Sequence, residues 1–322
     1  MDSPALRGNP LGDPSRRPIY LYRPPGFRPG LLAVYFLHGF TGSVHAWTGV
    51  PGFGVTVPER LDALIASGAV PPAVGVFVDG WTALGGSQWV NSPAIGNYRD
   101  YLAKDVVAFV DGRLGTLPRS EARAVVGKSS GGYGALVQGR HHPDVFGHVA
   151  SHAGDSGFEY CYLPDFPRTA AALLGTEPAS WLDALRRRAR ETKMRGDDHA
   201  PLNILAMAAA YSPRASASAG LDLPFDPETA RLRPEVWERW LAHDPVRFVP
   251  PSIEAFRKLR SVFLDCGTHD EFNLRWGARM LAESLRQGGV DVVHEEFEDN
   301  HRDTNYRYDR SLSYLLPRLA RG

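Results

Sequence analysis

The chain has 322 residues, of which 43% are hydrophobic and 22% are charged. This balance is typical of a globular protein with a large buried core, and it excludes a disordered or fibrous chain. The 36 basic residues equal the 36 acidic residues, so no net charge favours binding to nucleic acid or to a membrane surface. The two cysteines, Cys161 and Cys266, are too few for a disulfide framework, and the sequence predicts neither a metal site nor a cofactor.

Residues 1–17 form an N-terminal extension that lacks an apolar segment, unlike a secretory signal or a transit peptide. The sequence contains no run of about 20 apolar residues that could span a membrane. We therefore expect a cytoplasmic protein that acts on a small molecule. The sequence leaves open whether the protein is a monomer or a homodimer.

From residue 18 onward, short β-rich runs alternate with helical patterns, which is typical of an α/β protein with a mostly parallel sheet. The apolar run Leu31–Leu37 predicts a strand that is buried on both faces. Further strands are expected at residues 74–78, 124–126, 149–150, 262–264 and 290–293. Helices are expected at residues 58–67, 98–110, 131–140, 274–286 and 306–319.

The segment 156–252 interrupts this alternation, because it has helical patterns and many Pro and Ala residues but no convincing strand. A connection between parallel strands needs only about a dozen residues, so this segment is predicted to be an insertion. We expect a mainly helical lid beside the active site, the alternative being a stabilising appendage. The sheet core then comprises residues 18–155 and 253–322.

The pentapeptide from Gly127 to Gly131 matches the pattern G-x-S-x-G and places Ser129 at its centre. The pattern follows a predicted strand and begins a glycine-rich helix, which is the setting of a nucleophile elbow. Such a turn holds the serine in a strained backbone conformation at the edge of the sheet. Ser129 is therefore the predicted nucleophile, and the backbone N–H of Ser130 is placed to help bind an oxyanion.

A nucleophilic serine needs a base, and the base needs a carboxylate that orients it, in the chain order Ser, acid, His. Asp270 follows the predicted strand at 262–264 and is the preferred acid, with Asp265 and Glu271 as alternatives. His301 lies in a polar loop before the last helix, where the histidine of this order belongs. We expect His301 to be the general base.

The loop after the first buried strand is predicted to complete the oxyanion hole through the N–H of Phe40, while His38 beside it is expected to be structural. Other candidates have weaker support. Lys128 precedes the nucleophile and is a candidate for substrate contact. His152 either lines the pocket or is a hydrogen-bonded structural residue. Three tryptophans in nearby loops either form an apolar pocket wall or belong to ordinary packing: Trp47, Trp81 and Trp89.

These residues resemble the putative esterase family of α/β-hydrolases, which includes S-formylglutathione hydrolases, enterochelin esterase-like enzymes, feruloyl esterase domains and mycolyltransferases. The resemblance covers residue 18 to the C-terminus except the insertion, and its most specific part is Gly127–Ala135. The other matching segments are residues 37–42, 91–93, 142–147 and 267–270 and the loop of His301. The resemblance implies Ser129, Asp270 and His301 as a catalytic triad and the amides of Phe40 and Ser130 as the oxyanion hole. Lys128 and Ser130 differ from the residues that flank the nucleophile in many relatives.

The sequence therefore predicts a metal-independent serine esterase that acts on small or aryl carboxylic esters through an acyl-enzyme on Ser129. An acyltransferase or a thioester hydrolase would use the same residues. A third alternative is a catalytically inactive binding protein that retains this fold and presents the insertion to a partner.

Overall fold

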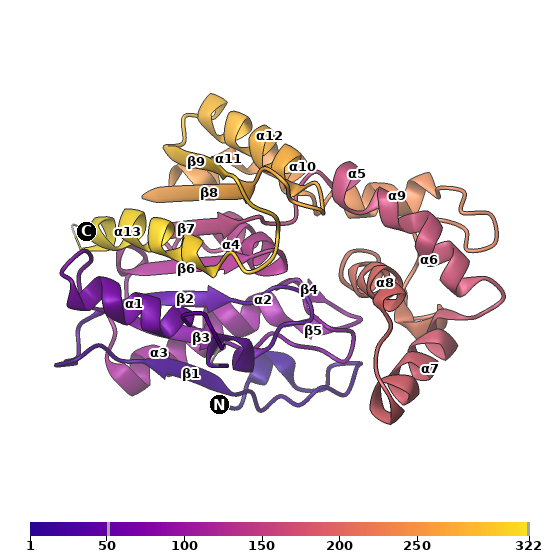
Figure 1. The fold of residues 1–322 in the computed structure, drawn as a ribbon, viewed down its shortest axis with the longest axis horizontal. Helices are drawn as coiled ribbons and strands as arrows, with labels where there is room; N and C mark the ends of the chain where they lie inside the picture. Colours follow the sequence, from indigo (N-terminus) through magenta and orange to yellow (C-terminus); the bar gives the residue numbers. More distant parts are fainter. Residues whose placement is uncertain (50–51, 321–322) are drawn as a thin grey trace.

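The computed structural model describes residues 1–49 and 52–320. At its centre lies a seven-stranded sheet in the order β1-β3-β2-β6-β7-β8-β9, in which all neighbouring pairs are parallel except β1 and β3 (Figure 1). The strands are β1 (Ile19–Tyr22), β2 (Leu32–Leu37), β3 (Ala73–Val78), β6 (Arg123–Lys128), β7 (His148–His152), β8 (Ser261–Gly267) and β9 (Val292–Phe297). A separate two-stranded ribbon consists of β4 (Asn91–Ser92) and β5 (Gly96–Asn97).

Helices cover both faces of the sheet. The helices α1 (Val57–Ala66) and α13 (Tyr308–Leu319) pack on one face, where they share a hydrophobic core with alternate residues of β2, including Val34 and Phe36. The intervening residues of β2, such as Tyr35, face the second core with α3 (Val107–Leu114), α4 (Ser130–His141) and α12 (Leu274–Gln287). Because successive side chains of a strand point to opposite faces, this two-sided burial explains the unbroken apolar run in the sequence.

The elements expected from the sequence are present, with shifts of a few residues at most ends. All six predicted strands occur, and β9 runs on to Phe297, beyond its expected end. The expected helix 98–110 is longer and is divided into α2 (Tyr98–Asp100), a π-helical segment (Tyr101–Val106) and α3. Two features were not expected, namely the edge strand β1 and the ribbon of β4 and β5. Residues 321–322, at the end of the predicted sheet core, lie outside the described residues.

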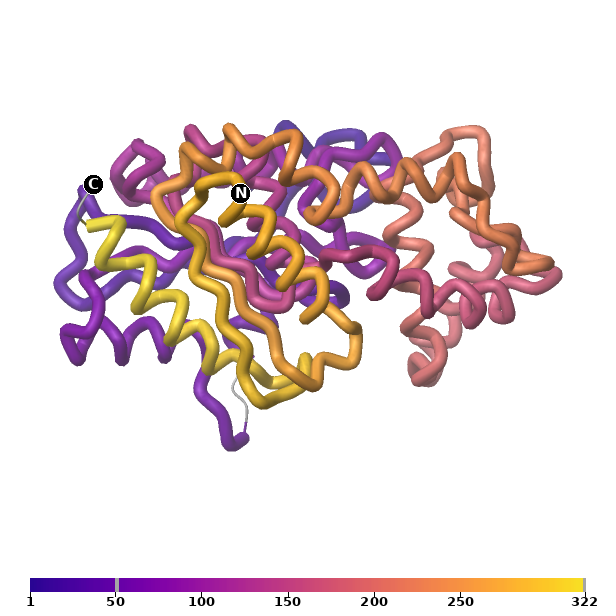
Figure 2. Tube along the Cα trace, turned by 90° about the horizontal axis from the view of Figure 1, so that it is seen from above, coloured from indigo at the N-terminus to yellow at the C-terminus, as the bar shows by residue number. Residues whose placement is uncertain are grey.

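The connection between β7 and β8 projects beyond the carboxyl ends of the strands, as Figures 1 and 2 show. Its helices are α5 (Phe158–Cys161), α6 (Phe166–Leu173), α7 (Pro178–Glu191), α8 (His199–Tyr211), α9 (Pro234–Leu241) and α10 (Pro245–Phe248), followed by α11 (Ile253–Arg257) next to β8. Buried aromatic rings pack between these helices, with Trp240 in contact with Phe166, Tyr211 and Trp237.

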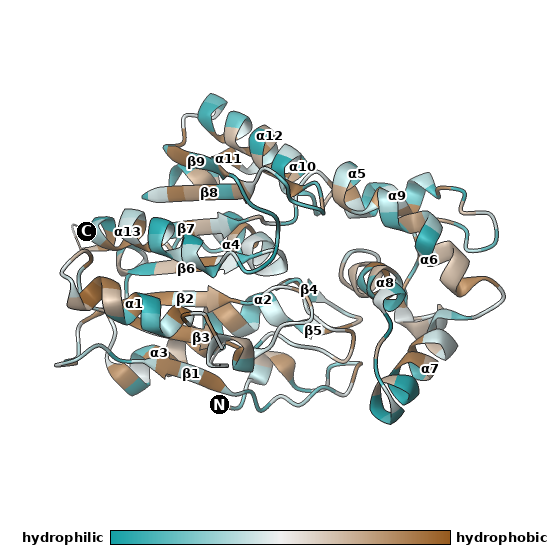
Figure 3. Ribbon diagram, viewed as in Figure 1, coloured by the Kyte–Doolittle hydropathy of each residue, from teal (hydrophilic) through white to brown (hydrophobic). Residues whose placement is uncertain are grey.

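Helix α8 is the most deeply buried of these insertion helices. It is buried along nearly its whole length and packs against α6 and β4, so it joins the insertion to the sheet core. Figure 3 shows apolar colouring along β2 and β3, while the exposed helix α7 of the insertion is largely hydrophilic. Among the described residues, no helix has the length and apolar character needed to cross a membrane.

Candidate active site

Ser129 lies in the sharp turn between β6 and α4, at the carboxyl edge of the sheet. Its φ of 57° and ψ of −129° are a strained combination for a residue with a side chain. The turn is held by the Ser129 N–H, which donates to the carbonyl oxygen of His152 at 2.9 Å. Glycine is required at position 131, two residues after the serine, because a Cβ there would lie 2.0 Å from the carbonyl oxygen of Leu37. The strained serine is therefore fixed by close contacts between β2, β6 and α4.

His301 and Asp270 form a hydrogen-bonded pair in the loops after β9 and β8. The Nδ1 atom of His301 lies 2.7 Å from Oδ2 of Asp270, and both side chains are buried. With Nδ1 occupied, Nε2 is the ring nitrogen left to act on a hydroxyl group. The pair has the arrangement of a general base oriented by a carboxylate.

Further hydrogen bonds fix the Asp270 carboxylate. Its Oδ1 atom accepts from the N–H of Phe272 at 3.0 Å, and its Oδ2 atom also accepts a weaker bond from the thiol of Cys266 at 3.6 Å. Burial raises the pKa of this thiol far above its usual value, so Cys266 remains a neutral donor. The carboxylate is thus held by the backbone of its own loop together with the buried side chains of Cys266 and His301.

The two alternative acids occupy different positions. Asp265 lies within β8 and is bound by His152 Nδ1 at 2.7 Å and by Arg307 Nε at 2.9 Å. Glu271 accepts a hydrogen bond from the backbone N–H of His301 at 2.9 Å, so it supports the histidine loop without contacting the imidazole through a hydrogen bond. Of the three carboxylates, Asp270 is the one paired with His301.

The loop after β2 passes close to Ser129. A Cβ on Gly39 would lie 3.1 Å from Cβ of Ser129, so glycine allows this close approach without a shift of the nucleophile turn. The N–H of Phe40, the next residue, donates no hydrogen bond to another residue in the described part of the chain, and the N–H of Ser130 lies at the start of α4, where helical N–H groups lack partners. His38 is buried and accepts from the N–H of Gly80 at 2.9 Å, and burial lowers its pKa.

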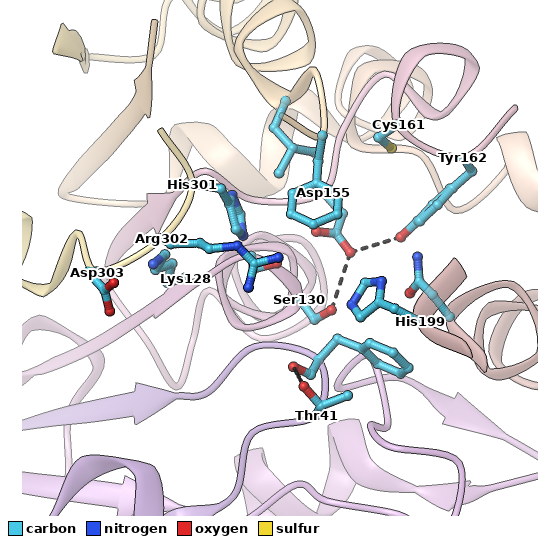
Figure 4. Close-up of a pocket in the computed structure, with 15 residues that line it drawn as sticks. Thr41, Lys128, Ser130, Asp155, Cys161, Tyr162, His199, His301, Arg302 and Asp303 are labelled. Carbon is cyan, nitrogen blue, oxygen red and sulfur yellow. Dashed lines mark hydrogen bonds between the residues drawn. The ribbon is translucent and has the colours of Figure 1, made fainter. Parts of the chain in front are cut away.

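A cavity of about 400 Å³ lies in front of Ser129. Figure 4 shows that Lys128, His301, Arg302 and Asp303 lie on one side of it, and Tyr162 and His199 of the insertion lie on the other. The cavity is lined by Phe40, Thr41, Lys128, Ser129, Ser130, Asp155, Cys161, Tyr162, His199, Asn203, Phe272, Leu274, His301, Arg302 and Asp303. The structure therefore brings the predicted nucleophile, base and oxyanion residues to one cavity.

The weaker candidates for substrate contact separate into two groups. Lys128 lines the cavity, and burial lowers the pKa of its ammonium group. The other four lie outside the cavity lining. Trp47 packs in the core against Phe36, Phe77 and Tyr308, and Trp81 is 40% exposed. Trp89 packs on Gly134 and donates from Nε1 to the carbonyl oxygen of His38. The ring nitrogens of His152 are bound to Asp265 and Ser311, as expected for its structural alternative.

The sequence patterns did not predict several residues that line the cavity. Tyr162, His199 and Asn203 belong to the insertion, where no local motif marks them. The ring of Phe272 packs edge-on against the His301 ring, with 4.8 Å between the centroids. Asp155 follows β7 at the carboxyl edge of the sheet, and this position alone could have singled it out.

Comparison with known proteins places the chain in a family. The sequence matches the family described as Putative esterase over residues 14–308. A search of curated protein sequences finds no match.

Solved structures resemble the whole chain at low sequence identity. A ferulic acid esterase is 17% identical with a TM-score of 0.60, and the alignment covers 100% of this chain and 95% of that one. FphF, a fluorophosphonate-binding serine hydrolase of Staphylococcus aureus, is 10% identical with a TM-score of 0.59 and coverages of 98% and 96%. An S-formylglutathione hydrolase from Agrobacterium tumefaciens is 14% identical with a TM-score of 0.57 and coverages of 99% and 93%.

These structures share the α/β-hydrolase fold, so the fold class predicted from the sequence is confirmed. The family match spans most of the chain and agrees with the resemblance found from its motifs. The chain belongs to the Putative esterase family and is a carboxylic ester hydrolase.

Proposed function

We propose that the protein is a serine esterase in which Ser129 is the nucleophile, His301 the general base and Asp270 the acid that orients it. The observation that carries the proposal is the hydrogen bond of 2.7 Å between His301 and Asp270, at a cavity that is also lined by the strained Ser129. This combination supplies an activated hydroxyl group and a proton acceptor at one place.

In the proposed reaction, Oγ of Ser129 attacks the ester carbonyl carbon while Nε2 of His301 takes the hydroxyl proton. The N–H groups of Phe40 and Ser130 bind the negative oxygen of the tetrahedral intermediate. His301 then returns the proton to the leaving alcohol, and an acyl-enzyme remains on Ser129. A water molecule, deprotonated by His301, releases the carboxylic acid and restores the serine.

The cavity supports small or aryl esters as substrates. Its volume of about 400 Å³ is at the lower end of small-molecule sites, and aromatic side chains contribute to its wall, including Phe40, Tyr162 and Phe272. Because Tyr162, His199 and Asn203 come from the segment 156–252, we assign to this insertion the role of a lid that shapes the pocket. The sheet core of residues 18–155 and 253–322 then supplies the reacting groups.

The proposal is tested by labelling the pure protein with a fluorophosphonate and locating the modified peptide by mass spectrometry. We expect labelling on Ser129, together with a loss of esterase activity on the order of 10⁴-fold or more in Ser129→Ala. Ser67→Ala is the matched control, because Ser67 is an exposed serine at the end of α1. Full activity of Ser129→Ala would refute the assignment of the nucleophile.

A further inference from the structure

A buried carboxyl group lies beside the proposed oxyanion hole without a role in the triad. Asp155 is 7% exposed and lines the cavity. Its Oδ2 atom accepts hydrogen bonds from Tyr162 Oη at 2.8 Å and Ser130 Oγ at 3.3 Å, which Figure 4 shows, and a third from Gln88 Nε2 at 2.9 Å. The carboxyl group therefore has one oxygen fully engaged by the protein.

The other oxygen, Oδ1, accepts no hydrogen bond within the described part of the chain, and Asp155 forms no ion pair with an arginine or lysine there. Burial raises the pKa of Asp155 above its usual value. A carboxyl group in this state is costly to fold, because buried acids are normally paired. Since the side chain lines the cavity, its free acceptor is available to a bound molecule.

Gln88, which donates to Asp155, is itself held in an unfavourable conformation with an oxygen atom left unpaired in the described part of the chain. Gln88 adopts a left-handed backbone conformation with φ of 51°, which is unfavourable for a residue with a side chain. Its amide nitrogen also lies 3.1 Å from the hydroxyl oxygen of Tyr211, while its buried Oε1 atom has no hydrogen-bond partner among residues 1–49 and 52–320. Gln88 comes from the sheet core, and Tyr162 and Tyr211 come from the insertion. Both parts of the chain thus converge on one carboxyl group.

We propose that Asp155 determines specificity by accepting, through Oδ1, a hydrogen bond from a hydroxyl group on the acyl part of the substrate. The inference rests on the proposed function, since it uses the same oxyanion hole to place the acyl group. A hydroxyl group fits better than an ammonium group, because Lys128 and Arg302 line the same cavity and would repel a further cation.

The hydroxyl group has to lie close to the ester carbonyl carbon. Ser130 supplies both the backbone N–H proposed for the oxyanion and the side-chain hydroxyl that bonds Asp155. The carboxyl group is therefore near the reacting centre, within reach of an acyl chain with a hydroxyl on its second or third carbon. Short hydroxyacyl esters are the substrate class that we infer.

The inference is tested with two pairs of 4-nitrophenyl esters of equal size, hydroxyacetate against propionate and 3-hydroxypropionate against butyrate. The kcat/KM of each ester is divided by its rate of hydrolysis by hydroxide, which removes differences in intrinsic reactivity. In the wild-type enzyme we expect the hydroxyacyl ester to be preferred by about 10- to 100-fold in at least one pair. This measurement requires no variant and is therefore independent of any folding defect.

The decisive variant is Asp155→Asn, which preserves the shape of the side chain. Because three donors converge on Oδ2, the amide oxygen of the variant is expected to take that place, and its NH₂ group then faces the cavity instead of an acceptor. The preference for the hydroxyacyl ester should disappear, while activity on propionate or butyrate falls less. Asp165→Asn is the control, since Asp165 is a half-buried acid of the insertion outside this network. It should retain the wild-type preference.

The outcomes separate the two proposals. Equal normalised kcat/KM within both pairs in the wild type would overturn the role of Asp155 while leaving the esterase intact. An unchanged preference in Asp155→Asn, with both esters slowed equally, would assign Asp155 a purely structural role. If the wild type prefers the aminoacetyl ester to the hydroxyacetyl ester and Asp155→Asn loses that preference, the group recognised by Asp155 is an ammonium group, and the proposed hydroxyl group is wrong. Absence of fluorophosphonate labelling on Ser129 together with no ester hydrolysis would refute the proposed function itself, and with it this inference.

Discussion

One buried aspartate lies within β8 and another follows it, and the proposed roles distinguish them. Asp270 binds His301 and Asp265 binds His152 and Arg307, in each case through hydrogen bonds shorter than 3 Å. We expect Asp270→Asn to lower kcat by about 10⁴-fold, because an amide favours the wrong imidazole tautomer and stabilises its charged form poorly. The measurement is steady-state kinetics on a 4-nitrophenyl ester.

Asp265→Asn is the matched comparison, and its effect should appear in stability. Removing a buried charge that faces Arg307 should lower the free energy of unfolding by about 3 kcal/mol, while the triad geometry is retained. Urea unfolding measures this change. A larger loss of kcat in Asp265→Asn than in Asp270→Asn would contradict the assignment of the acid.

Phe272 should matter to catalysis through its contact with His301. Removing the ring in Phe272→Ala loosens the imidazole, and an edge-on aromatic pair contributes about 1 kcal/mol, so we expect kcat/KM to fall by about 5-fold. Trp81→Ala should leave kcat/KM unchanged, because Trp81 is exposed and lies outside the cavity lining. A larger fall of kcat/KM in Trp81→Ala than in Phe272→Ala would show that Trp81 contacts the substrate.

The placement of single residues at the edge of the sheet could be predicted from the sequence where a local rule applied. Ser129, Asp270 and His301 each follow a strand of the sheet, and the strand order brings such positions to one edge. The tryptophans carry no such rule, since a large ring in a loop packs wherever space exists. Trp89, for example, fills the space left by Gly80 and Gly134. Asp155 has its position after β7 as a local signal, but its bond to Gln88 and the contact of Phe272 with His301 join distant segments, which no local pattern reveals.

At the scale of elements, the approach of α4 to β2 depends on Gly131. A Cβ there would overlap the carbonyl oxygen of Leu37, so Gly131→Ala should displace the helix and lower the free energy of unfolding by more than about 4 kcal/mol, or prevent folding. Urea unfolding followed by circular dichroism measures the change.

Gly112 is the control for a glycine inside a helix. It lies in α3, and a Cβ there meets nothing within 4 Å. Gly112→Ala should therefore raise the free energy of unfolding by about 0.5 to 1 kcal/mol through helix propensity alone. Similar small effects of both substitutions would refute the close contact at Gly131.

Element prediction succeeded where burial leaves a clear hydrophobic pattern in the sequence. The interior strands β2 and β3 are buried at every position and appear as apolar runs. The edge strand β1 has four residues, all half-buried, so neither alternation nor an apolar run marks it. The segment 156–252 is predicted as an insertion because no strand pattern occurs in it, but the placement of α8 against β4 is a tertiary contact that the sequence pattern does not contain.

At the scale of the whole molecule, buried histidines make stability depend on pH. His148 is 1% exposed, and its ring binds Ser261 Oγ at 2.6 Å and the carbonyl oxygen of Glu121 at 3.1 Å. Burial lowers the pKa of His148 to about 4, whereas an unfolded chain has a histidine pKa near 6.5. Between these values the unfolded chain binds a proton that the folded protein does not, so stability falls as the pH falls.

This linkage can be measured by urea unfolding at pH 7 and pH 5. A lowered pKa of this size contributes at most about 3 kcal/mol over its whole window, and about 2 kcal/mol of that is lost by pH 5. His148→Gln removes the imidazole and its buried hydrogen bonds, so the variant should be less stable than the wild type at pH 7. Because the glutamine side chain takes up no proton, the variant should lose less stability on acidification. His45→Gln, at an exposed position, should show the wild-type pH dependence. If His148→Gln and the wild type lose equal free energy between pH 7 and pH 5, another group governs the acid sensitivity of the fold.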